Sequence, residues 1–332
     1  MTPLRPTVLV VGGAGYIGSH ICKELHRSGY FPVCYDNLVY GHEWAVKWGP
    51  FEKGDINDTA RLVQVCAKHK PVGVIHLAAF AYVGESVIEP GKYYVNNVAG
   101  TIALLEAMRQ SKVSRIVFSS TCAVYGVPQR MPISEATPLN PVNPYGASKM
   151  MVERILQDYH HAYGLSYVAL RYFNAAGADP DGEIGEAHDP ETHLIPLALD
   201  VAMGLSTELV VFGNEYPTRD GTCIRDYIHV TDLARAHVLA LRRLEQNDNF
   251  YSSINLGTGN GTSILELVKA GEAVTGMKIP YRIAQPRPGD PPVLVADPSE
   301  ASAMLGWKPE FGEIGRILDH AWNFHRKTRK KG

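Results

Sequence analysis

The sequence predicts an α/β protein whose parallel sheet is covered by helices on both faces. Short runs rich in Val and Ile alternate with longer segments of helical period, as expected of strands buried on both sides. A glycine-rich segment separates the first such run from the first helical segment. The chain has 332 residues, which is enough for two domains or one large one.

Each predicted element follows from its residue types. Strands are predicted at short runs rich in β-branched residues, at residues 8–11, 33–35, 72–77, 115–119, 167–171 and 253–256. Helices are predicted where a capping residue or a periodic apolar face occurs, at residues 19–28, 58–69, 90–110 and 146–163. Right-handed crossovers between these strands would build a doubly wound sheet.

A smaller α/β lobe is expected in the second half of the chain. Residues 175–192 are rich in Gly, Pro and acidic residues, which predicts an active-site loop. The other segments assigned to this lobe are residues 193–204, 208–212 and 280–298. We therefore expect two interleaved domains that share one cleft. The first covers residues 1–174 with returning segments at about 226–257, and the second covers the rest of 175–332.

Composition argues against several classes of protein. Lys plus Arg total 32 and Asp plus Glu total 34, so we expect no broad attraction to nucleic acid or to an anionic membrane. No stretch approaches the ~20 apolar residues of a membrane span, and the N-terminus has no signal-peptide pattern. The five cysteines are odd in number and form no C-x-x-C pair, which argues against a disulfide framework or a zinc site. We expect a cytoplasmic protein without a metal site.

The glycine-rich segment carries a dinucleotide-binding pattern, which makes the expected sheet one of the Rossmann type. Gly12, Gly15 and Gly18 would allow a tight turn and a close approach of the backbone to a pyrophosphate. Asp36 ends the next predicted strand, where a carboxylate can bind both ribose hydroxyls. This favours NAD over NADP, because Asp36 would repel a 2′-phosphate and Asn37 follows it in place of an arginine.

Tyr145 and Lys149 form a candidate proton-transfer pair. They lie four residues apart in a predicted helix, so their side chains share one face. A tyrosine with a pKa of about 10 is a poor base at neutral pH, but a nearby ammonium group and a positive nicotinamide would lower that pKa. Thr121 ends a strand at the edge where such sheets place ligands, and its hydroxyl can hold the reacting oxygen. An isolated Tyr-x-x-x-Lys is usually a surface pair, but this context favours catalysis.

These residues resemble the extended short-chain dehydrogenase/reductases and, among them, the nucleotide-sugar 4-epimerases. The likeness covers residues 8–322 and is most specific at 171–174 and 225–230. It implies an isomerase with tightly held NAD, a UDP-sugar substrate gripped through its UDP by the second lobe, and a homodimer. The implied reaction is C4 epimerisation of a UDP-hexose, UDP-glucose or UDP-galactose, through a transient 4-keto sugar. Tyr145 would act as its acid and base.

The resemblance also assigns binding residues. Candidate cofactor contacts are Gly12, Gly15, Tyr16, Ile17, Gly18, Asp36, Asn37, Asp55, Ile56, Leu77, Ala78, Ala79, Asn96, Ser119, Tyr145, Lys149 and Tyr172. Candidate substrate contacts are Thr121, Tyr145, Phe173, Asn174, His193, Leu194, Phe212, Arg225, Arg287 and Asp290. The two arginines would supply paired donors to phosphate. Three alternatives stay open: an ion pair of Arg225 with Asp226, a helix-start turn at Asp55 and a buried structural amide at Asn96.

Three positions depart from the common pattern of that family. Ala81 stands where many members have a lysine that reaches the cofactor, so one contact would be missing. Thr121 stands where serine is common, and its hydroxyl keeps the role. Leu294 stands where a bulky tyrosine excludes N-acetylated sugars or a small residue admits them. A UDP-N-acetylhexosamine 4-epimerase therefore stays open, as does a 4-epimerase of UDP-pentoses (xylose and arabinose).

Two further alternatives rank lower. A nucleotide-sugar dehydratase would need an Asp-Glu pair directly after the strand-end threonine, and this chain has Cys122 and Ala123 there. A non-catalytic NAD-binding protein would have no need of Tyr145, Lys149 and Thr121 together.

Overall fold

Seven parallel strands form the large sheet of the computed structural model, which describes residues 5–287 and 290–329. Their order is β10-β6-β5-β4-β1-β2-β3, and all neighbouring strands are parallel. The strands are β1 (Thr7–Val11), β2 (Phe31–Asp36), β3 (Phe51–Lys53), β4 (Gly73–His76), β5 (Arg115–Thr121), β6 (Ser166–Tyr172) and β10 (Tyr251–Leu256). The predicted α/β fold and all six predicted strands are confirmed, with ends that differ by at most two residues.

The prediction missed β3. This strand has three residues, and its central Glu52 is buried among the cations of Arg61 and Lys68 and the ring of His69. A three-residue strand without a β-branched run is too short to give a periodic signal in the sequence. Its charged residue is held by contacts with the neighbouring helix, which the sequence does not show.

Helices cover both faces of the sheet, and alternate residues of β1 face the two layers. Val8 and Val10 pack with α1 (Tyr16–Arg27) and α8 (Val230–Gln246). Leu9 and Val11 pack with the opposite layer, which consists of α2 (Thr59–His69), α5 (Gly100–Gln110) and α6 (Pro144–Tyr163). Two apolar faces on one strand explain the continuous apolar run in the sequence.

Two of these helices differ from their predicted extents in ways that matter for the site. The predicted helix at 90–110 consists of α4 (Pro90–Tyr93), a π-helical segment η2 (Tyr94–Ala99) and α5. Helix α6 begins at Pro144, and the side chain of the preceding Asn143 accepts a hydrogen bond of 2.8 Å from the Gly146 amide. This cap places Tyr145 in the first turn of the helix.

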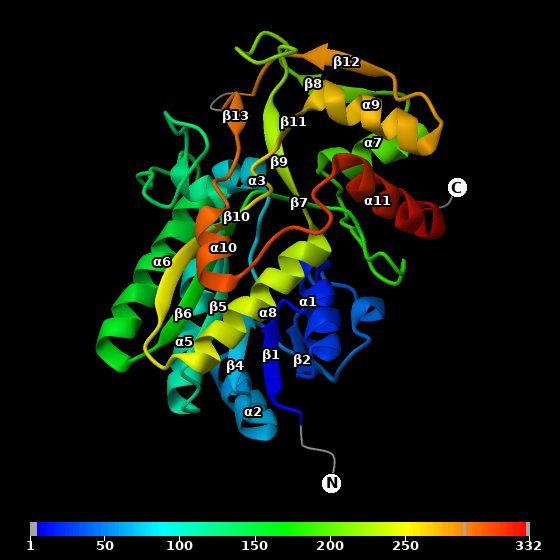
Figure 1. Ribbon diagram of the computed structural model, residues 1–332. Helices are drawn as coiled ribbons and strands as arrows, with labels where there is room; N and C mark the ends of the chain where they lie inside the picture. The colour runs from blue at the N-terminus through cyan, green and yellow to red at the C-terminus, as the bar shows by residue number, and fades with distance from the viewer. Residues whose placement is uncertain (1–4, 288–289, 330–332) are drawn as a thin grey trace.

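A smaller lobe lies at the end of the large sheet opposite the N-terminus (Figure 1). Its main sheet has β9 (Ile224–His229) paired with β7 (Asn174–Ala176), β11 (Gly261–Ser263) and β13 (Val293–Leu294). A second sheet pairs β8 (Leu209–Phe212) with β12 (Tyr281–Ala284). The helices of this lobe are α7 (Leu194–Ala202), α9 (Ile264–Thr275) and α11 (Ile314–Thr328).

The remaining short helices are η1 (Glu43–Ala45), α3 (Val83–Ile88), η3 (Cys122–Tyr125) and α10 (Ser299–Leu305). The segment at 226–257 divides between the lobes: its first residues belong to β9, whereas α8 and β10 pack on or join the large sheet. The ends of the predicted domains, residues 1–4 and 330–332, lie outside the described residues. Within the described part of the chain, no helix is long and apolar enough to cross a membrane.

Candidate active site

The glycine-rich turn between β1 and α1 is closely packed at Gly12 and Gly18 and less closely packed at Gly15. Gly12 has φ +86°, and a Cβ there would lie 2.6 Å from the Ala78 nitrogen. A Cβ on Gly18 would lie 2.0 Å from the Gly12 carbonyl oxygen, so both positions require glycine. At Gly15 the nearest atom would be 3.5 Å away. A Cβ at Gly15 would make only this ordinary van der Waals contact. Gly15 precedes the first turn of α1, where amide groups attract an anion such as a pyrophosphate.

Asp36 stands beside this turn at the end of β2. Its carboxylate accepts hydrogen bonds from the amides of Ala14 (3.0 Å) and Leu38 (2.8 Å). Burial raises the pKa of Asp36, while these amide bonds act in the opposite direction. Asn37 donates to the Asp55 carboxylate at 2.9 Å, so the predicted ribose and adenine residues lie close together. The next residue, Ile56, is buried in the core below them.

The segment after β4 contains the predicted cofactor contacts Leu77, Ala78 and Ala79, which are partly buried. It is held by Asn97, whose amide accepts from the Phe80 nitrogen at 2.9 Å and donates to the Phe80 oxygen at 3.0 Å. Asn97 lies in η2 and is 2% exposed. The prediction named Asn96 as the candidate buried amide, but Asn96 is partly exposed and donates to Asn97. The adjacent asparagines in the sequence were the available signal, and they could not show which one faces inward.

Tyr145, Lys149 and Thr121 converge at the carboxyl edge of the sheet. Tyr145 is 9% exposed in the first turn of α6, one turn before Lys149. Thr121 ends β5, and its hydroxyl accepts a hydrogen bond from the Ala123 amide at 3.2 Å. Lys149 Nζ donates to the Ser119 carbonyl at 2.8 Å. The residues predicted to carry the chemistry therefore lie on two adjacent elements.

Burial dominates the electrostatics of this group. It raises the pKa of Tyr145, and the hydroxyl of Thr121 lowers that pKa. Burial also lowers the pKa of Lys149 to about 7, with an opposing effect from Glu153. The lowering of the Tyr145 pKa by the Lys149 ammonium and by a positive nicotinamide ring stays a prediction.

A buried network that the prediction missed supports this edge of the sheet. Glu153 accepts hydrogen bonds from Ser120 (2.5 Å) and from the Arg171 guanidinium (2.5 Å at the shortest). Ser119 Oγ lies 2.8 Å from the His237 ring, which fixes the strand from the other face. Tyr172 is the register partner of Thr121, and burial raises the pKa of Tyr172 to about 12.

The predicted UDP-binding residues come together in the smaller lobe. Arg225 Nη2 donates to Asp290 Oδ1 at 2.5 Å, so the alternative pairing with Asp226 is wrong. Asp226 instead accepts from the amides of Thr258, Gly259 and Ala296. The Arg287 guanidinium lies 4.0 Å from the centre of the Phe212 ring. Residues 288–289, within the predicted binding loop, lie outside the described residues.

The other substrate candidates lie at the ends of elements: Asn174 begins β7, and Phe173 directly follows β6. Phe173 is buried with Leu294 at its edge, and Asn174 donates to the Asp226 carbonyl at 3.1 Å. Leu194 is the first residue of α7. His193 precedes it, and carboxylates of Glu186 and Glu191 hold its ring at 2.8 and 2.9 Å.

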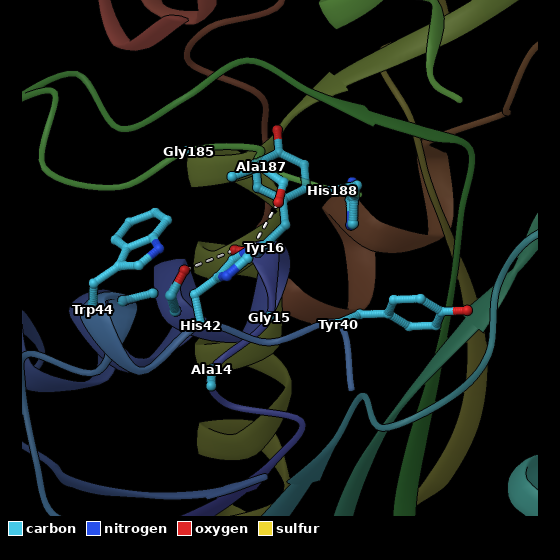
Figure 2. A pocket seen from close by; sticks show the side chains of 11 residues that line it. Ala14, Gly15, Tyr16, Tyr40, His42, Trp44, Gly185, Ala187 and His188 are labelled. Carbon is cyan, nitrogen blue, oxygen red and sulfur yellow. Dashed lines mark hydrogen bonds between the residues drawn. The ribbon is translucent and has the colours of Figure 1, made fainter. Parts of the chain in front are cut away.

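The loop before α7 crosses over the glycine-rich turn. Figure 2 shows Gly185, Ala187 and His188 above the first turn of α1, where they line a pocket with Tyr16 and His42. The Tyr16 phenol donates to the Gly177 carbonyl at 2.7 Å, and His42 Nε2 lies 2.6 Å from the Ala187 oxygen. Ile17, the next residue of α1, packs against the core. These contacts join the two lobes beside the cofactor candidates.

Position 81, where the expected lysine is replaced, is on the surface. Ala81 is exposed, and the nearby Lys92 lies 4.3 Å from the centre of the Phe80 ring. Lys92 is paired with Glu85 at 2.6 Å.

Known proteins share this fold and sequence over nearly the whole chain. A UDP-glucose 4-epimerase from Rhizobium leguminosarum bv. trifolii is 51% identical over 322 residues, 97% of this chain and 98% of that protein. The structure of UDP-glucose 4-epimerase from Brucella ovis in complex with NAD has a TM-score of 0.94 and 55% identity, covering 96% of this chain and 98% of that one. The enzyme from Bifidobacterium longum, in complex with NAD+ and UDP, has a TM-score of 0.92 and 41% identity, covering 97% of this chain and 98% of that one. Residues 8–257 match the family described as the NAD dependent epimerase/dehydratase family, and the chain belongs to that family.

Proposed function

We propose that the protein is an NAD-dependent isomerase that inverts C4 of a UDP-hexose and so interconverts UDP-glucose and UDP-galactose. The observation that carries the proposal is the convergence of Tyr145, Thr121 and Lys149 at the sheet edge beside the glycine-rich turn. Relatives of about this length and known by this activity support the choice of substrate.

The residues around the glycine-rich turn fit NAD. Gly15 is the N-cap of α1, where backbone amides would face a pyrophosphate, and Asp36 presents a buried carboxylate where a ribose diol would lie. NAD held by these residues would supply reversible hydride transfer with C4 of the sugar. Because nothing is oxidised overall, the protein needs no second redox substrate.

Tyr145 moves the proton in both directions. Its phenolate takes the proton of the C4 hydroxyl as that carbon becomes a ketone. After the sugar has turned its other face, the phenol returns the proton to the C4 oxygen, which restores the alcohol with inverted configuration. Thr121 holds the reacting oxygen in line with the phenol. Lys149 donates a hydrogen bond to the Ser119 carbonyl and so fixes helix α6, which carries Tyr145, against strand β5, which carries Thr121.

The smaller lobe binds the UDP part of the substrate. Arg225 is fixed by Asp290, and Arg287 lies over the Phe212 ring, so both guanidinium groups are held in place for phosphate. A sugar that must present both faces cannot be held in one pose, so specificity belongs to the nucleotide.

A panel of substrates tests this proposal. The purified protein is given UDP-galactose, UDP-glucose, their N-acetyl forms and UDP-xylose, with no added cofactor, and products are separated by chromatography. We expect UDP-glucose and UDP-galactose to interconvert faster than the other pairs. Turnover of UDP-xylose alone would assign the protein to pentoses, and turnover of the N-acetyl forms alone would show that Leu294 admits the larger sugar. No conversion of any UDP-sugar would overturn the epimerase assignment.

We also propose that the protein works as a homodimer in the cytoplasm. The proposed interface is the surface of α3, η2, α5 and α6, where Ile88 is 81% and Val95 61% exposed and Met151 is also exposed. All five cysteines, which lie within the described residues, are free thiols, and this supports a reducing compartment.

A further inference from the structure

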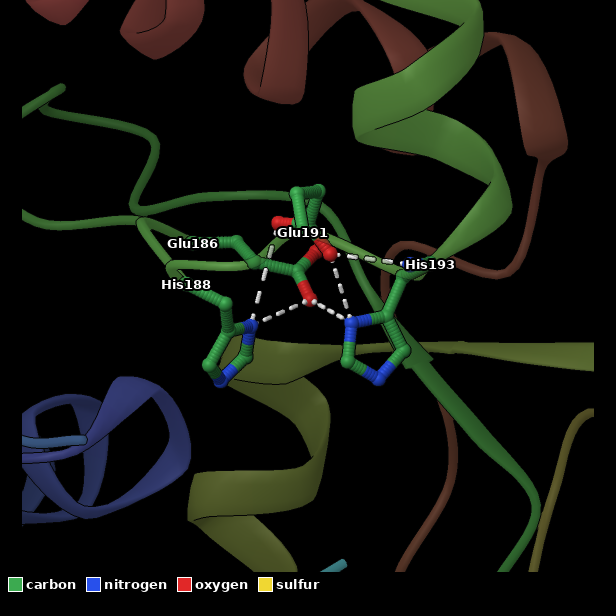
Figure 3. Close-up of side chains that lie close together, drawn as sticks. All are labelled: Glu186, His188, Glu191 and His193. Atoms are coloured by element: carbon green, nitrogen blue, oxygen red, sulfur yellow. Dashed lines mark hydrogen bonds and ion pairs between the residues drawn. The ribbon is translucent and has the colours of Figure 1, made fainter. Parts of the chain in front are cut away.

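Four side chains of metal-ligating types converge in the loop that leads into α7. Figure 3 shows the imidazoles of His188 and His193 facing the carboxylates of Glu186 and Glu191. His193 Nδ1 lies 2.8 Å from Glu186 Oε1 and 2.9 Å from Glu191 Oε1. His188 Nδ1 lies 3.1 Å from the same Glu186 oxygen. One ligand atom from each residue falls within 4.8 Å of the others.

A buried oxygen in this cluster lacks a hydrogen bond. Glu191 Oε1 accepts from the amides of Thr192 and His193, both at 2.8 Å. Glu191 Oε2 has no hydrogen-bond partner among the described residues, although the side chain is only 5% exposed. This oxygen lies 3.8 Å from His188 Nδ1, beyond hydrogen-bond reach. A buried carboxylate oxygen without a hydrogen-bond partner indicates that a bound ion or molecule completes the cluster.

The spacing and chemistry of the four atoms suit zinc. Ligands that bind Zn²⁺ at about 2.0–2.2 Å in a tetrahedron lie about 3.4 Å from one another. The nitrogen-to-oxygen separations are 2.8 and 2.9 Å for His193 and 3.1 and 3.8 Å for His188, on both sides of that value. The 2.9 Å separation involves Glu191 Oε1 and the 3.8 Å separation involves Glu191 Oε2. Two imidazoles with two carboxylates favour Zn²⁺ over Mg²⁺ or Ca²⁺, which prefer six or more oxygen ligands.

We propose that Glu186, His188, Glu191 and His193 form a binding site for a divalent transition-metal ion, with Zn²⁺ as the best match. Four protein ligands close the coordination sphere, so the ion is structural and takes no part in the reaction. The site goes beyond the proposed epimerase function and does not depend on it.

The position of the cluster indicates what the ion does. The His188 ring lies 6.2 Å from Tyr16 in α1 and 6.3 Å from Tyr82. The Tyr82 phenol donates to the Pro190 carbonyl at 3.2 Å. An ion that binds four residues of this loop therefore fixes it against the NAD-binding domain, directly before α7.

Protons compete with the metal ion for this cluster. Burial lowers the pKa of both histidines, but hydrogen bonds to Glu186 and Glu191 outweigh it and raise the pKa to about 9 for His188 and about 10 for His193. Metal binding must therefore displace these protons. In the competing interpretation, the protonated histidines form ion pairs with Glu186 and Glu191, and the cluster binds no metal.

Cobalt titration distinguishes these interpretations. The full chain is dialysed against a chelator and titrated with Co²⁺, and visible absorption is recorded together with bound metal by mass spectrometry. The variants are His188→Ala and Glu191→Gln, and the control is His161→Ala, which changes an exposed histidine outside the cluster. We expect the wild type and the control to bind one equivalent with the spectrum of four-coordinate cobalt. Each cluster variant should bind about tenfold more weakly or worse.

Wild-type protein that binds no more Co²⁺ than the two cluster variants would overturn the proposal. Melting temperatures measured in chelator show which variants fold. Glu191→Gln keeps the size and the amide contacts of the side chain, so it decides the outcome if His188→Ala does not fold. Turnover of UDP-sugars is not the readout, so failure here leaves the proposed function unaffected.

Discussion

The phenol of Tyr145 is the residue on which the proposed chemistry depends. Replacing Tyr145 with Phe removes one oxygen from a buried side chain and keeps its ring. We expect turnover of UDP-galactose to fall by ~10²–10⁴-fold, because general acid and base catalysis contributes about this much. Bound NAD, measured by absorbance after gel filtration, should stay at the wild-type level.

Tyr163→Phe is the matched control, because Tyr163 is an exposed tyrosine at the far end of the same helix. It should turn over at the wild-type rate. A Tyr145→Phe enzyme that is as fast as this control would remove Tyr145 from the mechanism.

Asp36 is a second single residue with a specific expected effect, which is the preference for NAD over NADP. In Asp36→Ala we expect weaker retention of NAD and a smaller preference for NAD over NADP, because the negative charge that repels a 2′-phosphate is lost. Binding of both cofactors to stripped protein by fluorescence titration measures the effect. Asp58→Ala, which removes the N-cap of α2, serves as a control for lost stability. An unchanged ratio of the two dissociation constants would contradict a ribose contact by Asp36.

At the residue scale, the sequence identified groups whose chemistry shows in local spacing, such as Gly15, Tyr145 and Lys149. It missed Asn97 and Glu153, because each of them contacts another element through residues 17 or 18 positions away. It also missed Glu191, whose partner His193 is two residues away, because that loop has no periodic pattern. The pKa of Tyr145 follows the same rule: burial raises it, and burial is a property of the folded structure.

Among the elements, η2 shows how a helix supports the cofactor segment. Its Asn97 bonds both backbone groups of Phe80 and also Ser148 in α6. In Asn97→Ala these partners are left unpaired, and we expect the free energy of unfolding to fall by roughly 1–3 kcal/mol. Urea denaturation measures this change.

Asn96→Ala provides the control for Asn97→Ala, since Asn96 is the partly exposed neighbour in the same segment. It should lose much less stability. Equal losses in the two variants would show that Asn97 has no special structural role.

The sequence predicted elements well where the residues repeat with a clear period. The strands of the large sheet have such signals in their β-branched runs. The start of α6 was predicted two residues late, because the cap at Asn143 sets it and not a period. A π-helical segment such as η2 keeps the apolar pattern of an ordinary helix, so periodicity cannot reveal it. The three residues of β3 are too few for any period.

For the whole molecule, assembly through the surface of α3, η2, α5 and α6 is the main expectation. We expect sedimentation equilibrium to give twice the chain mass for the wild type. Val95→Glu combined with Met151→Glu places charge on the exposed apolar surface and should give a monomer. The control is Val39→Glu, which changes a similarly exposed valine outside this surface. This variant should stay dimeric. A wild type that sediments as a monomer at micromolar concentration would contradict the homodimer.

The sequence predicted a second lobe from a change of composition after residue 174, where Gly, Pro and acidic residues become frequent. It did not predict the contacts between the two lobes. Tyr16 to Gly177 and His42 to Ala187 join segments that are separated by more than a hundred residues. Only the folded chain shows that the loop before α7 lies over the glycine-rich turn.

The fate of the hydrogen at C4 tests the proposed reaction most directly. UDP-galactose carrying deuterium at C4 is incubated with the protein in ordinary water, and the UDP-glucose formed is analysed by nuclear magnetic resonance. We predict that the deuterium stays at C4, because the hydrogen leaves and returns without contact with water while Tyr145 exchanges only the hydroxyl proton. Product with solvent hydrogen at C4 would contradict this mechanism.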